Sequence, residues 1–147
     1  MKLVRLGQGK WTVLAVMTDR GECPVLELLA VSGDPGERLL ADLRENIPQR
    51  GPPLNNPEAS KALGDKIFEL REPVKKGGTL RVLYFYDEGY LVVSVNGELK
   101  KRDKTSNELI DAATSVRTAY MEAKRTKRLV IEDLPQPTDS AGDDDAT

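Results

Sequence analysis

The sequence predicts an α+β domain in which a small, mostly antiparallel sheet of about four strands packs against two N-terminal helices and a C-terminal helix. Three observations support this prediction. Short apolar runs rich in β-branched residues alternate with turn residues between positions 66 and 97, as neighbouring antiparallel strands do. Two apolar stretches led by proline come before them, and an alanine-rich amphipathic stretch follows residue 105.

The N-terminal third is predicted to hold one strand and two helices. Residues 11–17 (WTVLAVM) form a short apolar run typical of a strand. Pro24 suits the first turn of a helix, and a second helix over about 34–47 begins with Asp34 as its cap and ends at Pro48. The first strand must therefore join the sheet after a helical excursion.

The middle of the chain is predicted to form three strands that pair with their sequence neighbours. Residues 66–71, 80–86 and 90–95 resemble strands, and Gly89 lies in the hairpin turn between the last two, where a positive φ is needed. The C-terminal helix is expected to start at a capping box, Thr105-Ser-Asn-Glu108, and to end in a run of cations.

The net charge of −2 averages two unlike segments. Residues 61–130 carry 15 basic and 10 acidic side chains, whereas residues 131–147 carry six acidic side chains and no basic ones. We expect one domain over residues 1–130, followed by a disordered acidic tail over residues 131–147. A cationic domain favours an anionic partner, although a solvated charged surface explains the same composition.

The residue types present exclude several kinds of catalysis. The chain has no His and a single cysteine, Cys23. Ser–His–Asp and Cys–His triads, His-ligated zinc and an internal disulfide are therefore excluded. No apolar run reaches the length of about 18 residues that a membrane span needs, and no secretory signal is visible. We expect a cytoplasmic protein without membrane contact.

Three segments carry a resemblance to a known family: Ile67-Phe-Glu-Leu-Arg71, then Gly78-Thr-Leu-Arg81-Val-Leu-Tyr84-Phe85, then Asn96-Gly-Glu-Leu-Lys100-Lys101-Arg-Asp-Lys104-Thr105. In this order they resemble the RelE/HigB-like toxins of type II toxin–antitoxin systems, and most of all the phage-derived HigB-like branch. The similarity covers roughly residues 8–125. It implies a RelE-like fold and a ribosome-dependent endoribonuclease that cuts mRNA and so inhibits translation. The implied partners are the ribosome, mRNA and a cognate helix-turn-helix antitoxin that holds the toxin inactive.

The chain departs from this branch at three positions. The branch usually has a His where this chain has Asn96, an aromatic residue near Glu98, and a Pro where this chain has Ser106. An alternative is therefore a catalytically degenerate, phage-derived binding module of the same fold. A third possibility is a sequence-tolerant nucleic-acid binder, whose affinity would fall with salt.

Cleavage of RNA by its own 2′-hydroxyl requires removal of a proton, stabilisation of the phosphate charge and protonation of the leaving oxygen. Without His, clustered lysines with lowered pKa values and the planar fork of arginine are the candidates for these tasks. This chemistry needs no metal and no cofactor. The predicted catalytic residues are Arg71, Arg81, Lys100, Lys101 and Lys104, and the predicted RNA-binding residues are Lys75, Lys76 and Arg102.

Structural roles stay open for the same residues. Arg81 shares a strand face with Leu83 and Phe85, so its stem could cover apolar surface while its head pairs with Glu69 or Asp87. For Arg71 a functional role and an ordinary ion pair are weighted equally, and the lysine cluster could be a solvated loop.

Overall fold

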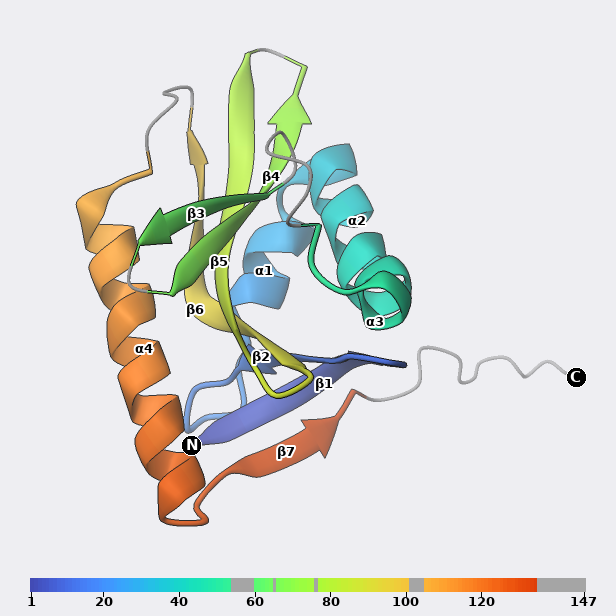
Figure 1. Cartoon of the computed structure of the whole chain (residues 1–147). Helices are drawn as coiled ribbons and strands as arrows, with labels where there is room; N and C mark the ends of the chain where they lie inside the picture. The colour runs from blue at the N-terminus through green and yellow to red at the C-terminus, as the bar shows by residue number, and fades with distance from the viewer. Residues whose placement is uncertain (54–59, 65, 76, 101–104, 135–147) are drawn as a thin grey trace, which may run out of the picture.

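A seven-stranded sheet forms the middle layer of the protein, as Figure 1 shows. The computed structural model describes residues 1–53, 60–64, 66–75, 77–100 and 105–134, with the backbone alone for residues 95–100. In sequence order the strands are β1 (Lys2–Gln8), β2 (Thr12–Val16), β3 (Ser60–Gly64), β4 (Ile67–Val74), β5 (Gly78–Asp87), β6 (Tyr90–Lys100) and β7 (Val130–Asp133). Across the sheet their order is β3-β4-β5-β6-β2-β1-β7.

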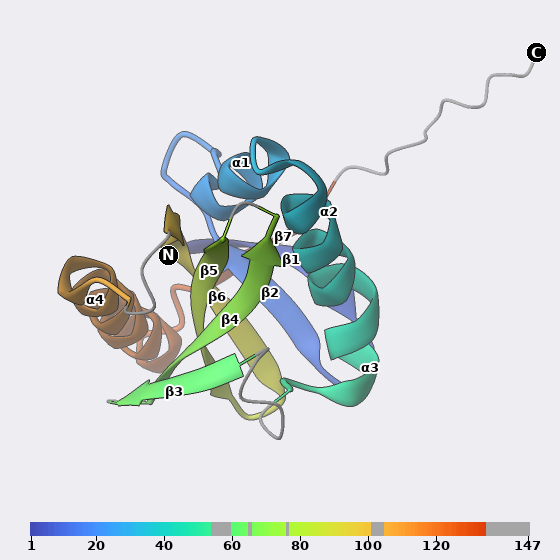
Figure 2. The ribbon, with the colours of Figure 1, turned by 90° about the horizontal axis from the view of Figure 1, so that it is seen from above.

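Helices cover both faces of this sheet, as the view in Figure 2 makes clear. One face packs against α1 (Pro24–Ala30) and a continuous helical run made of α2 (Gly33–Ala41), the π-helical turn η1 (Asp42–Asn46) and α3 (Ile47–Arg50). The long helix α4 (Asn107–Arg125) covers the other face.

The prediction of a small, mostly antiparallel sheet of about four strands is wrong. The sheet has seven strands and is mixed, because β2 runs parallel to β6 and β1 runs parallel to β7. Three strands were missed: β1, β3 and β7. Of these, β3 and β7 are short and mostly exposed, so their sequences carry almost no apolar alternation that would indicate a strand.

The predicted pairing inside the central hairpins is confirmed. Strands β4, β5 and β6 pair antiparallel with their sequence neighbours. The strand predicted over residues 11–17 is β2, and it joins the same sheet beside β6 after the helical excursion. Strands β2 and β6 thus lie side by side although the helices separate them in sequence, and the apolar runs of β2, β5 and β6 are buried at the centre of the sheet.

Pro48 does not end the second helical run, contrary to the prediction. The turn before it is π-helical, and the Ile47 N–H donates to the carbonyl of Asp42, five residues earlier. A widened turn accommodates a proline, whose ring crowds the preceding turn and which has no N–H to donate. The run ends instead at Gly51, whose φ of +81° is a conformation that glycine adopts without strain.

Two apolar cores lie on opposite faces of the sheet. The core under α1 and the helical run includes Val13, Leu29, Leu43, Val82 and Tyr84. The core under α4 includes Leu14, Ile67, Leu83, Phe85 and Tyr120.

The C-terminal strand closes the sheet against the N-terminus. β7 pairs with β1, the Val130 N–H donates to the carbonyl of Met1, and Arg5 pairs with Asp133. The predicted domain boundary at residue 130 falls at the start of this strand, and residues 135–147 lie outside the described residues. No helix in the described part of the chain is long and apolar enough to cross a membrane.

Candidate functional site: an arginine–glutamate cluster on the sheet

A polar cluster interrupts the sheet face on which α4 packs. Arg71 on β4 lies directly opposite Arg81 on β5 in the antiparallel register. Because side chains alternate along a strand, Glu69 shares its face with Arg71, and Arg81 shares its face with Leu83 and Phe85. The cluster therefore continues the apolar core under α4 toward the end of the sheet from which that helix starts.

Glu69, Arg81 and Thr105 form a buried hydrogen-bonded network. Arg81 Nη1 donates to Thr105 Oγ1 at 2.9 Å and lies 3.5 Å from Glu69 Oε2. The Thr105 hydroxyl donates to that same carboxylate oxygen. The three residues are 1%, 0% and 4% exposed for Glu69, Arg81 and Thr105 respectively. Buried charges are tolerated where they are paired and hydrogen-bonded, so each member of the network needs the others.

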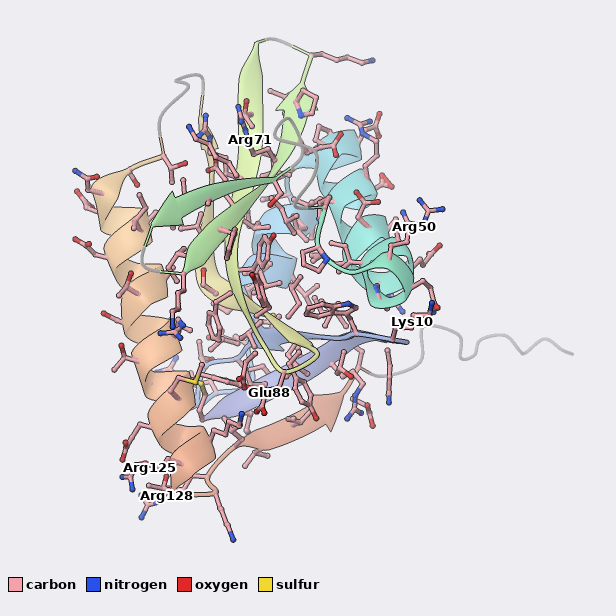
Figure 3. The ribbon with its side chains drawn as sticks, viewed as in Figure 1. Lys10, Arg50, Arg71, Glu88, Arg125 and Arg128 are labelled. Atoms are coloured by element: carbon pink, nitrogen blue, oxygen red, sulfur yellow. The ribbon has the colours of Figure 1, made fainter. Side chains whose placement is uncertain are left out.

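Arg71 is the member of the cluster that reaches solvent. Its Nε lies 3.7 Å from Glu69 Oε1, and its side chain stays 25% exposed. Figure 3 places Arg71 at the opposite end of the sheet from the turn that carries Glu88. Glu69 thus pairs one carboxylate oxygen with each arginine, and two guanidinium charges face one carboxylate. A partly exposed arginine held in this way suits the binding of a phosphate oxygen.

The structure separates the two predicted catalytic arginines. Arg71 is accessible, whereas Arg81 has the Glu69 pairing that was kept open as its structural role and is fully buried. Arg81 therefore cannot touch a ligand in this conformation without the network opening. Within the network Arg81 pairs with Glu69, and Glu69 in turn pairs with Arg71.

The predicted lysines are described only in part. Lys75 is exposed in the turn between β4 and β5. The backbone of Lys100 pairs with Thr79, two residues along β5 from Arg81. The other predicted cations lie outside the described residues: Lys76, Lys101, Arg102 and Lys104. Their roles stay predictions.

Sequence reasoning did not place Glu69 and Thr105 in the site. Thr105 was assigned to a capping box, but Ser106 is the N-cap of α4, and its hydroxyl accepts a hydrogen bond from the Leu109 N–H at 3.2 Å. The Thr105 hydroxyl is thereby left for the network. The available signal was the spacing of Glu69 and Arg71, which puts opposite charges on one strand face.

A second polar cluster lies near the β5–β6 turn. The Tyr120 hydroxyl donates to Asp87 Oδ2 at 3.1 Å, and Lys124 Nζ donates to the same oxygen at 2.9 Å and also pairs with Glu88. Burial and the Asp87 carboxylate raise the pKa of Tyr120, so the phenol stays protonated. Tyr120 is 2% exposed and packs on Phe85, which confirms the prediction that it is a core residue. This cluster fastens α4 to the hairpin. Within the described residues, no group of three His, Cys, Asp or Glu side chains is arranged to hold a metal ion.

The protein is thus a mixed sheet with helices on both faces, and the arginine–glutamate cluster places the partly exposed Arg71 on its α4 face. The model of one family, Phage derived protein Gp49-like (DUF891), matches residues 10–118 of the chain. The chain therefore belongs to the Gp49-like phage-derived family, which is associated with RelE/HigB-like toxins of toxin–antitoxin systems. Searches of curated proteins and of solved structures found no match.

Proposed function

We propose that this protein is the toxin of a type II toxin–antitoxin system and acts in the cytoplasm as a ribosome-dependent mRNA endoribonuclease. Membership of the Gp49-like family and the resemblance of its strand segments to RelE/HigB-like toxins support the proposal. Its proposed partners are the ribosome, mRNA and a helix-turn-helix antitoxin. The observation that carries it is the partly exposed Arg71, held by a buried Glu69–Arg81–Thr105 network.

In the proposed reaction the 2′-hydroxyl of the RNA attacks the adjacent phosphate and expels the 5′-oxygen of the next nucleotide. Arg71 stabilises the negative charge that develops on the phosphate oxygens, because its guanidinium is oriented by Glu69 before the RNA arrives. Lys100, Lys101 and Lys104 are the proposed proton-transfer residues, with Lys75, Lys76 and Arg102 on the RNA backbone. Arg81 acts as a positioning residue.

The residues on either side of the lysine segment lie next to the arginine–glutamate cluster, which supports the assignment of these lysines to the site. Lys100 is the last residue of β6 and pairs with Thr79 beside Arg81, and Thr105 accepts a hydrogen bond from Arg81. Both ends of the segment that carries Lys101 and Lys104 are thus attached to the strand of Arg81.

The test compares Arg71→Ala with the matched control Arg50→Ala under inducible expression. Arg50 is an equally cationic, exposed residue on α3, in the layer opposite α4 (Figure 3). Wild type and Arg50→Ala should arrest growth and create new mRNA 5′ ends, and Arg71→Ala should lower cleavage on the order of a hundredfold. Co-expression of a helix-turn-helix protein encoded beside the toxin should restore growth. Equal cleavage by both variants would show that Arg71 takes no part in the cleavage.

A catalytically degenerate binding module of the same fold is the second candidate. Two observations favour it: Asn96 stands where the phage-derived branch usually has His, and Arg81 is fully buried. This candidate predicts that the wild type sediments with ribosomes in a salt-dependent manner but produces neither growth arrest nor new mRNA ends.

A further inference from the structure

A groove with an apolar floor lies between α1 and the C-terminal edge of the sheet. Its volume is about 540 Å³, within the range of ligand-binding clefts. Val4, Met17, Leu26 and Leu134 are among the residues that line it. Val4 belongs to the core on the α1 face and the other three residues pack against that core, so the groove lies on the opposite face of the sheet from Arg71.

Three acidic residues border this floor with side chains that lie away from the α4 face: Glu22, Glu27 and Glu132. Glu132 is partly neutralised by β1, since it lies 3.6 Å from Lys2, and the Asp133 side chain pairs with Arg5 on the opposite face. Glu22 and Glu27 are exposed and form no ion pair with any residue that the structure describes. The groove is therefore apolar at its base and negatively charged at its rim.

The chain that follows the groove has the wrong charge to occupy it. Residues 135–147 carry Asp139, Asp143, Asp144 and Asp145 and no basic residue. Like charges repel an acidic segment from an acidic rim, and the same acids strengthen the attraction for a cationic partner. Charge complementarity thus selects a basic occupant, and the apolar floor selects one with large aliphatic side chains.

We propose that this groove is the docking site for a basic amphipathic peptide segment of a partner protein. Aliphatic side chains of the segment lie on the floor formed by Met17, Leu26 and Leu134, and its Lys or Arg side chains pair with Glu22 and Glu27. This inference goes beyond the proposed nuclease function and does not depend on it, because the groove and Arg71 lie on opposite faces.

The test uses a fluorescein-labelled synthetic Leu/Lys amphipathic peptide of two heptads, titrated with the full-length protein at low salt. The Glu22→Gln/Glu27→Gln variant is compared with Glu37→Gln/Glu45→Gln, which removes two exposed charges from the α2–η1 run instead. Two controls vary the peptide: one replaces every Leu by Ser and keeps the charge, and the other replaces every Lys by Glu.

Fluorescence anisotropy should show binding that the groove variant weakens on the order of tenfold, because each rim ion pair contributes up to about fivefold. The control variant should bind like the wild type, and both altered peptides should fail to bind. In ¹H–¹⁵N correlation spectra, the shifted amides should lie in 17–27 and 132–134. Equal weakening by both variants, undiminished binding of the Ser peptide, or no binding of the Leu/Lys peptide would overturn the proposal.

Discussion

Replacing Arg81 by methionine should cost the protein far more stability than replacing Arg71. Arg81 is 0% exposed and its partner Glu69 is 1% exposed, so Arg81→Met leaves a carboxylate buried without its main counter-charge. Methionine keeps most of the aliphatic volume, so the loss reports on the charge and the hydrogen bonds rather than on a cavity.

The geometry sets the size of the effect. At the 3.5 Å between Arg81 Nη1 and Glu69 Oε2 the attraction is about 5 kcal/mol, if the effective dielectric constant is about 20. Removing one partner of such a pair lowers the free energy of unfolding by about 3–5 kcal/mol. Arg71→Met should cost less than about 1 kcal/mol, because the Arg71 side chain is 25% exposed and its Nε lies 3.7 Å from Glu69.

Urea denaturation measures both variants, with an unchanged slope showing that the two-state transition is preserved. The double variant Glu69→Leu/Arg81→Met should recover at least half of the loss, because no buried charge is then left unpaired. A loss below about 1 kcal/mol for Arg81→Met would refute the reasoning, as would a double variant less stable than Arg81→Met.

Three further predictions follow from close packing and from buried phenols. Gly36→Ala should destabilise the protein by about 1–3 kcal/mol in thermal unfolding, although this change usually favours a helix, because the new Cβ would lie 2.0 Å from the Leu29 carbonyl oxygen. Tyr120→Phe should cost about 1 kcal/mol by urea denaturation, since Asp87 loses one hydrogen bond and keeps that of Lys124. Burial raises the pKa of Tyr84 from 10.0 to about 12, so the stability that this phenol contributes is complete below pH 10 and is lost as the pH rises through 12. Tyr84→Phe should therefore show a shallower decline in urea-derived stability over that interval, and an equal decline would contradict this assignment.

Local sequence rules located the helices and the central hairpins. Prolines, glycines and apolar periodicity identified α1, the long second helical run, α4 and the strands β2, β4, β5 and β6. These signals come from residues that are close in sequence, and turns and amphipathic faces can be predicted from such local patterns.

The missed features depend on contacts between distant residues. β7 has four residues and becomes a strand because it lies beside β1, more than a hundred residues earlier in the chain. Pro48 is tolerated because a π-helical turn precedes it, and the residue types in that turn do not predict a π-helix.

Only part of the candidate site could be predicted, because the rest of it also depends on contacts between distant residues. The arginines and the possible Glu69 pairing could be read from strand alternation. That Arg81 is buried and Arg71 is accessible could not, because burial depends on Thr105 and on where α4 begins.

The most direct test of the central claim is cleavage of a defined mRNA by the purified full-length protein, with and without ribosomes. We expect cleavage only on the ribosome, with a 2′,3′-cyclic phosphate on the upstream fragment. Arg71→Ala should lose this cleavage while unfolding at nearly the same urea concentration as the wild type. Intact mRNA on ribosomes with the wild type, or full cleavage by Arg71→Ala, would contradict it.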